Sequence, residues 1–309
     1  MSEIARPLFE EEQISSFLSA IDFVNYFSDK DNLERVFGNV LDVNIAFAQS
    51  VTLIKDANND LLDVVTNNTL DSKNHRATPY KTDEEREGLR NNIINELTST
   101  IRPEDDEKIC YGKGGMLPSS GVVSAKREAF IIIGLPASGK SGIASKVSDY
   151  FDAVLIDSDF AKRKIPEFCK KNGATLVHKE SKMIKDEIMH AAIYKGLNFV
   201  LPIIGSDYEE VLNTINGLRR HRYKVSVILV ELDRVKATRR AFSRFIKTKR
   251  YIPLSKILDE YSNGPSLVFY KILTQKPNLP MALIDTDVPF GNKPKIVVEQ
   301  KFREIRKII

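Results

Sequence analysis

A glycine-bracketed loop at residues 134–142 has the residue types and spacing that bind the phosphates of a nucleotide. It reads GLPASGKSG and fits the pattern G-x-x-x-x-G-K-[ST] without a mismatch. An apolar run precedes it and an amphipathic segment follows, which is the strand–loop–helix context that the pattern requires. Lys140 is expected to neutralise phosphate oxygens, and the Ser141 hydroxyl is expected to bind Mg²⁺. The predicted cofactor is therefore ATP with Mg²⁺, held by Gly134, Leu135, Pro136, Ala137, Ser138, Gly139, Lys140, Ser141 and Gly142.

Two carboxylates follow the next apolar run along the chain. The segment AVLIDSDFAKRKIPEF places Asp157 and Asp159 at the expected carboxyl end of a strand, where open α/β sheets bind ligands. Strand alternation would put both side chains on one face. One of them is expected to accept the proton of an attacking hydroxyl group, while the other supports Mg²⁺ or caps a helix. The alternative interpretation is that both are only turn or capping residues.

A basic segment, RVKATRRAFSRFIKTKRYIP, supplies a third feature with chemical potential. Arg240 and Arg244 lie one helical turn apart, and Arg250 follows. Arginines that close over a γ-phosphate provide much of the catalysis in phosphoryl transfer. The segment is therefore predicted to be a phosphate lid, with a solvated basic face or a nucleic-acid-binding stripe as the alternatives.

The elements that must position these residues have the pattern of an α/β fold. Apolar runs alternate with helical patterns at 141–151, 179–195, 207–221 and 233–247. Continuous apolar strands between helices indicate a parallel sheet that is covered on both faces. The prediction is a P-loop kinase-like sheet flanked by helices. Its five strands lie in AFIIIGL, AVLID, NFVLPII, KVSVILVEL and MALIDTD.

The N-terminal quarter of the chain differs from the rest in charge. Residues 1–71 hold 13 acidic and 4 basic side chains, although the whole chain has a net charge of +4. Apolar residues recur there at three- and four-residue steps, which is typical of helices. We expect an acidic helical module at 1–75, a helix near 82–100 within a connecting segment at 76–127, and the kinase domain at 128–309.

The composition excludes several classes of protein. With 42% hydrophobic and 28% charged residues, the chain has the composition of a soluble globular protein. Two cysteines without clustered histidines indicate neither a disulfide framework nor a zinc site. No apolar stretch has the length of a membrane span, and the first residues lack the pattern of a secretory signal. A cytoplasmic location without membrane association is expected.

Several motifs together resemble the zeta-toxin family of P-loop kinases. They are GLPASGKS, IDSDFAKRKIPEF, LVHKES, GLNFVLPIIG and RAFSRF…KRYIP, in this order, and the similarity covers about residues 85 to 275. The resemblance implies ATP-dependent phosphorylation of a hydroxyl group on a nucleotide sugar, with UDP-N-acetylglucosamine as the best-known acceptor. It also implies a toxin that a small helical antitoxin holds in check.

The resemblance also assigns roles to individual residues. Lys140 and Ser141 match the phosphate-loop residues, and Asp159 matches the general base. Arg250, together with either Arg240 or Arg244, matches the arginines that grip phosphate; the spacing leaves this choice open. The acidic residue that binds the acceptor matches Glu180 or Glu187. The candidate acceptor-binding residues are Asp157, Lys162, His178 and Glu180, with Glu187 as the alternative to Glu180.

The acceptor side departs from the family pattern. The family's third strand commonly ends in Glu-Gly-Thr, where the glutamate and threonine help to hold the acceptor. Here the strand ends in LPIIG, so that Pro202 and Ile204 occupy those positions and Ser206 replaces an arginine. UDP-N-acetylglucosamine is therefore predicted by analogy only.

Other functions remain as alternatives. A polynucleotide kinase or an NAD-type kinase would use the same ATP site, although a nucleic acid is not the expected partner. An ATP-dependent protein-binding module would bind the nucleotide without transferring phosphate. One hypothesis for the acidic N-terminal module is that it docks on the basic kinase domain as an inhibitor within the same chain. The alternatives are an oligomerisation module, a secretion-chaperone segment or an extension that completes the core.

Overall fold

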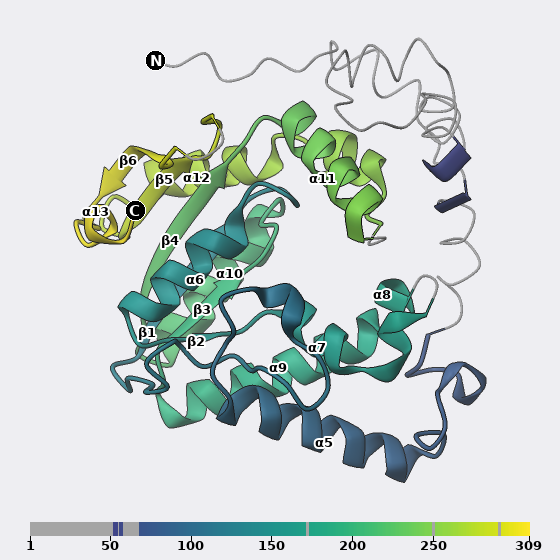
Figure 1. Ribbon diagram of the computed structural model, residues 1–309. Helices are drawn as coiled ribbons and strands as arrows, with labels where there is room; N and C mark the ends of the chain where they lie inside the picture. The colour runs from purple at the N-terminus through teal and green to yellow at the C-terminus, as the bar shows by residue number, and fades with distance from the viewer. Residues whose placement is uncertain (1–51, 55, 58–67, 171–172, 249–250, 290–291) are drawn as a thin grey trace.

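The computed structural model describes residues 52–54, 56–57, 68–170, 173–248, 251–289 and 292–309. Most of the acidic helical module predicted at 1–75 lies outside this part of the chain. The described portion centres on one six-stranded sheet with helices on both faces (Figure 1).

The sheet confirms the predicted α/β fold. Its strands run in the order β2-β3-β1-β4-β5-β6, with parallel pairing throughout β2 to β5 and an antiparallel β6 at the edge. The five predicted strands are present, and β6 is an addition that the sequence pattern did not indicate. The bounds are β1 Glu128–Ile133, β2 Val154–Leu155, β3 Phe199–Pro202, β4 Lys224–Glu231, β5 Met281–Asp285 and β6 Lys295–Gln300.

The four predicted helices of the kinase domain are also present, with further helices between them. The bounds are α5 Asp83–Ser99, α6 Lys140–Tyr150, α7 Ser158–Lys164, α8 Gly173–Leu176, α9 His178–Lys195, α10 Tyr208–Arg220, α11 Arg234–Thr248, α12 Gly264–Gln275 and α13 Ile305–Ile308, with shorter turns η2 Lys73–His75, η3 Asp106–Lys108, η4 Pro166–Cys169 and η5 Lys256–Tyr261.

The strand order places these helices on opposite faces of the sheet. The connection from β1 to β2 runs toward one edge, whereas the connection from β3 to β4 runs toward the other. Right-handed crossovers therefore put α6 on one face and α10 on the opposite face, and Figure 1 shows α6 in front of the strands and α10 behind them. The carboxyl end of β1 consequently opens into a crevice between connections that diverge, where such sheets bind ligands.

Helix α5 confirms the helix predicted near 82–100 and is part of the main body. Thr82 and Glu85 form a capping box at its start, in which each side chain accepts a hydrogen bond from the other residue's backbone N–H. Leu89, Ile93 and Leu97 lie one turn apart and belong to the same apolar core as the strands. The helix packs along α7 and α9 (Figure 1), so it supports the elements that carry the candidate acceptor-binding residues.

A buried arginine connects α5 to the chain on both sides of α8. The guanidinium of Arg86 donates to Glu167 at 2.9 and 3.0 Å and to Glu180 at 2.6–3.1 Å, and all three side chains are fully buried. Burial opposes the charge of Arg86, but the hydrogen bonds that it donates to its two carboxylate partners outweigh burial and raise its pKa. Removing one partner from such a group leaves an uncompensated buried charge, which is strongly destabilising.

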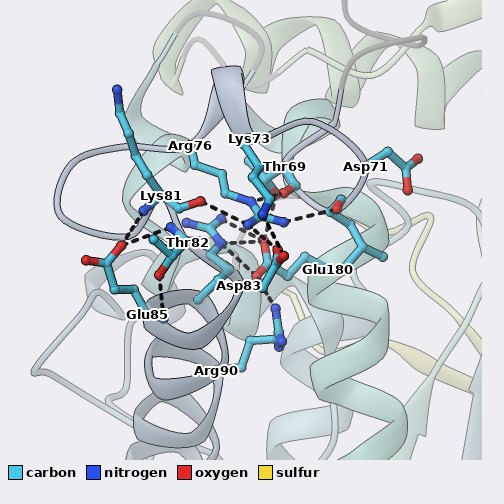
Figure 2. A network of polar contacts seen from close by, with 12 residues as sticks. Thr69, Asp71, Lys73, Arg76, Lys81, Thr82, Asp83, Glu85, Arg90 and Glu180 are labelled. Carbon is cyan, nitrogen blue, oxygen red and sulfur yellow. Dashed lines mark hydrogen bonds and ion pairs between the residues drawn. The ribbon is translucent and has the colours of Figure 1, made fainter.

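The chain just before α5 is fastened to the same group (Figure 2). The Thr69 hydroxyl donates to Glu180 at 2.7 Å, and the Ala77 N–H donates to Glu167 at 2.5 Å. Arg76 donates to the Thr69 carbonyl and to Asp83. Residues 68–83 are thus held against the kinase body by buried polar contacts, although the sequence analysis had placed residues 68–75 in the N-terminal module.

A second apolar cluster joins a short N-terminal stretch to α11. Ile54 and Ala57 are buried in it together with Leu135, Ala237 and Phe242. Leu135 belongs to the phosphate loop and Phe242 to α11, so this cluster reaches the candidate nucleotide site. Among the described residues, the search for a helix long and apolar enough to cross a membrane found none.

We predict that Arg86→Leu lowers the free energy of unfolding by about 3–5 kcal/mol, because two buried carboxylates lose their partner. Chemical denaturation measures this directly. Lys73→Ala is the matched control, since Lys73 forms an ion pair with Asp83 in which both side chains are more than 60% exposed; we expect little change from it. An Arg86→Leu protein as stable as the Lys73→Ala protein would contradict this role.

Candidate active site

The loop between β1 and α6 has the backbone geometry of a phosphate cradle. Gly134 has a φ of 151° and its Cα lies so close to β4 that an added Cβ would be 2.4 Å from the Val230 carbonyl oxygen. Gly139 caps α6 in the left-handed region, with a φ of 93°. Its successor Lys140 begins the helix, so the first free N–H groups of α6 face the loop. The predicted strand–loop–helix context is confirmed.

Lys140 lies at the centre of this cradle. Its Nζ donates to the carbonyl oxygens of Gly134 and Leu135, both at 2.6 Å. Burial lowers its pKa to about 7; the carboxylates of Asp157 and Asp159 act in the opposite direction, and the positive charge of Arg244 adds to the lowering. Lys140, Arg244 and the two aspartates are therefore close enough to influence one another, as residues of one site must be.

The two aspartates occupy different positions from those predicted. Strand β2 ends at Leu155, so the expected strand alternation is wrong at this point. Asp157 is the N-cap of α7 and accepts from the Asp159 N–H at 2.9 Å, while Asp159 lies in the first turn of the helix. The capping interpretation thus holds for Asp157, and both carboxylates nevertheless act on Lys140.

The aspartates also differ in their environment. Burial, followed by the charge of Asp159, raises the pKa of Asp157 to about 6. The Asp159 carboxylate accepts from Lys162 Nζ at 2.8 Å, so Lys162 contacts one of the two acids. His178 begins α9. Its pKa is lowered by burial and by the positive charge of Lys162, while the charge of Asp159 acts in the opposite direction.

Arg240 and Arg244, both on α11, have different surroundings. Arg240 donates to the Thr286 carbonyl oxygen at 3.1 Å, at the end of β5, whereas the charge of Arg244 acts on Lys140. The positive charge of Arg244 thus acts on the lysine of the phosphate loop, whereas Arg240 contacts the turn after β5. Arg250 lies outside the described residues.

Glu180 has a different place from the one predicted. Its side chain is fully buried and accepts from Arg86, Arg90 and Thr69. Every carboxylate oxygen is thus engaged within the protein, which fits a structural role and not contact with an acceptor. Glu187, the alternative, is exposed on α9.

The residues that follow β3 hold the phosphate loop. They stand at the positions where the sequence departs from the Glu-Gly-Thr pattern. The Ile204 carbonyl oxygen accepts from the Gly134 N–H at 2.9 Å, and Gly205, with a φ of 71°, packs where a Cβ would be 2.5 Å from the Ile133 side chain. The altered LPIIG strand therefore holds the phosphate loop through its backbone.

The residues around the loop fit a Mg²⁺ ion that is bound mainly through a nucleotide. Among the described residues no group of three or more His, Cys, Asp or Glu side chains gathers as a metal cage. Mg²⁺ in phosphoryl-transfer sites needs only one or two protein oxygens, with phosphate oxygens and water completing the shell. Ser141, exposed in the first turn of α6, and Asp157 offer oxygens of that kind.

One further residue at this site did not stand out in the sequence. Thr286, directly after β5, donates its hydroxyl to the Ser138 carbonyl of the phosphate loop at 2.7 Å. It stands in the quoted run MALIDTD, at the carboxyl end of a predicted parallel strand. That position is the signal that could have identified it.

Comparison with known families places this site in context. Residues 121–270 match the family model described as Zeta toxin. The chain contains a zeta-toxin domain. The domain spans β1 to α12 and includes the phosphate loop, both aspartates and α11. The match supports an ATP-using toxin kinase and does not define the acceptor.

One solved structure shares the fold of this chain at low sequence identity, and a second has a slightly lower TM-score. A structure of the PezAT chromosomal toxin–antitoxin system of Streptococcus pneumoniae has a TM-score of 0.50 at 13% identity, covering 71% of this chain and 83% of that chain. The complex AvrRxo1-ORF1:-ORF2 with ATP has a TM-score of 0.49 at 15% identity, covering 72% and 69%. No curated protein matches the sequence.

We predict that Asp157→Asn raises the free energy of unfolding at pH 7.5 by about 1–2 kcal/mol, since each unit of pKa shift corresponds to about 1.4 kcal/mol and the side chain keeps some solvent contact. The pKa of Asp157 is raised to about 6, so folding favours the protonated form, and the wild-type protein loses stability as the pH rises from about 4 through 6. Asparagine caps a helix as well as aspartate does, so the cap is retained.

Denaturation of both proteins between pH 4 and 8 measures this effect. The difference is expected to shrink toward pH 4, where the carboxyl group is protonated in the folded state and partly protonated in the unfolded state. A constant difference across this range, or a less stable variant at pH 7.5, would contradict the assignment.

Proposed function

We propose that this zeta-toxin domain transfers the γ-phosphoryl group of ATP to a hydroxyl group of a small molecule. The observation that carries the proposal is the convergence of Lys140, Arg244 and two carboxylates at the phosphate loop. A phosphate loop that only bound a nucleotide would not need Asp157 and Asp159 beside it. A proton acceptor next to the γ-phosphate is what transfer to a hydroxyl group requires.

Each residue has a distinct task in this mechanism. The loop N–H groups and Lys140 hold the β- and γ-phosphates, and Arg244 balances the charge that spreads over the γ-phosphoryl oxygens in the transition state. Asp159 accepts the proton of the acceptor hydroxyl as its oxygen attacks in line. Mg²⁺, when bound at Ser141 and Asp157, neutralises phosphate charge. Arg250 is proposed as a second phosphate-gripping residue.

The proposed acceptor is a nucleotide sugar, with UDP-N-acetylglucosamine as the first compound to test. Lys162 and His178 beside Asp159 are the proposed acceptor contacts. Glu180 is buried, and the LPIIG segment at the end of β3 lacks the glutamate and threonine of the family pattern. We therefore expect the acceptor to be bound by residues other than those of the family pattern. An NAD-type acceptor is the second candidate for the same reason, and a polynucleotide end is the third.

The acidic N-terminal segment is proposed to inhibit the kinase. Ile54 and Ala57 share an apolar cluster with Leu135 of the phosphate loop and with Phe242 of α11. A segment that packs on both the loop and the lid helix restrains the motions that admit a nucleotide. A separate antitoxin chain is the alternative inhibitor, as in the toxin–antitoxin system of the fold neighbour.

We predict that Asp159→Asn and Lys140→Ala each reduce phosphoryl transfer by at least about 100-fold, the scale on which a general base or a phosphate clamp acts. Mass spectrometry of reactions with ATP and either UDP-N-acetylglucosamine or NAD measures the transfer. Lys146→Ala, an exposed lysine on the same helix as Lys140, is the control and is expected to retain activity. Transfer retained in Asp159→Asn but lost in Asp157→Asn would move the base to Asp157.

We predict that Ile54→Asp increases the rate of phosphoryl transfer several-fold, because a charge in the apolar cluster expels the N-terminal segment. Asp56→Asn is the matched control, since Asp56 is an exposed neighbour in the same stretch. Initial rates at limiting ATP report the effect. Equal rates in a folded Ile54→Asp protein would remove the inhibitory role and leave the segment as a structural extension.

A further inference from the structure

Thr286 sits where three parts of the active site meet. It follows β5 directly, and the Asp285 carboxylate accepts from the Asp287 N–H at 2.7 Å, which turns the chain at this residue. The side chain thereby points back toward the phosphate loop instead of continuing the strand. Only 8% of the residue is exposed.

The Thr286 hydroxyl links the phosphate loop to β4. Its Oγ1 lies 2.7 Å from the Ser138 carbonyl oxygen and 2.9 Å from the Glu231 carbonyl oxygen. The Glu231 oxygen also accepts the Thr286 N–H at 3.1 Å, so it has a donor without the hydroxyl. The shorter contact, to Ser138, is therefore the one for which the hydroxyl matters.

Ser138 itself is fixed through its backbone. Its hydroxyl is fully buried and makes no hydrogen bond to any of the described residues, while its N–H donates to the Leu135 carbonyl at 3.2 Å. Removing the Thr286 hydroxyl would therefore leave the Ser138 carbonyl without its side-chain donor. A buried carbonyl that loses its partner is costly, and the peptide is then free to rotate.

Peptide geometry connects this hydrogen bond to phosphate binding. The Ser138–Gly139 peptide is planar and trans, so its C=O and N–H point in opposite directions. Directing the Ser138 oxygen toward Thr286 directs the Gly139 N–H to the other side of the loop, into the cradle. Gly139 can hold the left-handed conformation that this requires, and an added Cβ there would lie 3.6 Å from the Thr286 methyl group.

The backbone of Thr286 extends the link to α11. Its carbonyl oxygen accepts from Arg240 at 3.1 Å, and the adjacent Asp287 forms an ion pair with Lys236 at 2.5 Å. Helix α11 and the phosphate loop thus both contact the turn that follows β5.

We propose that Thr286 is a positioning residue for nucleotide binding: its hydroxyl orients the Ser138–Gly139 peptide so that the Gly139 N–H donates to a phosphate oxygen, while its carbonyl holds Arg240. The inference rests on the proposed function only in that the loop binds ATP. It does not depend on which hydroxyl compound is phosphorylated.

The test compares Thr286→Val, which keeps the shape and removes the hydroxyl group, with Thr286→Ser, which keeps it. Calorimetric titration of the full-length proteins with Mg-ATP and Mg-ADP measures both dissociation constants. Thr286→Val is expected to weaken binding of both by about 5- to 10-fold, the value of one to two hydrogen bonds in water. Thr286→Ser is expected to stay within about twofold of the wild-type protein.

Thr238→Val controls for a merely structural loss. The Thr238 hydroxyl is fully buried and donates to the Arg234 carbonyl within α11 at 2.7 Å, so the same chemical group is removed away from the loop. Its nucleotide affinity is expected to match that of the wild-type protein, although thermal denaturation shows a comparable loss of stability.

Unchanged affinity in Thr286→Val would overturn the inference, as would equal weakening in Thr238→Val or in Thr286→Ser. A wild-type protein that binds neither nucleotide would instead overturn the proposed function together with this inference. The two failures are therefore distinguishable.

Discussion

The backbone of the phosphate loop is the constraint on which the rest of the site depends. The chain must leave β1 sharply, pass through two glycine positions that other residues fill poorly, and enter α6 with its N–H groups inward. Such a path is unfavourable in isolation and persists because neighbouring strands hold it. Ile204 after β3 accepts the Gly134 N–H, Val230 of β4 packs against Gly134, and Thr286 after β5 holds the Ser138 carbonyl.

A second constraint is the burial of charge on the acceptor side. Arg86 holds Glu167 and Glu180 without access to water, and Lys164 is likewise fully buried beside Glu96. These contacts bind α5 to the elements that carry Asp159 and His178. A site that must present a base and cations at fixed distances needs such a rigid support, because small displacements of catalytic groups are costly. The same ion pairs therefore stabilise the protein and support the elements that carry the candidate site residues.

Much of the fold could be predicted because it follows from local patterns. Continuous apolar runs predicted β1 to β5, and the helix predicted near 82–100 is α5, which begins with a capping box. Strand β6 was missed because its residues are exposed or only half-buried, and its apolar run is limited to Ile296, Val297 and Val298. The position of Asp157 was misjudged because β2 is only two residues long and the chain then turns into α7.

The residues that the sequence could not place depend on distant partners. Glu180 looked like an acceptor ligand, and only its contact with Arg86, 94 positions away, shows its structural use. The contact of Arg240 likewise lies far along the chain, at Thr286 after β5, some 46 residues beyond it. Phosphate-loop chemistry, in contrast, is encoded in nine consecutive residues, and for that reason it was visible from the start.

The central claim is that the loop, the acid pair and the lid move a phosphoryl group instead of merely binding ATP. The most direct measurement supplies the full-length protein with ATP labelled with ¹⁸O in its γ-phosphoryl group and with a cell metabolite extract. Mass spectrometry then follows the label. We expect the labelled phosphoryl group to appear on an organic hydroxyl compound. Label that stays in ATP, or that appears only in inorganic phosphate, would rule out transfer to a hydroxyl group.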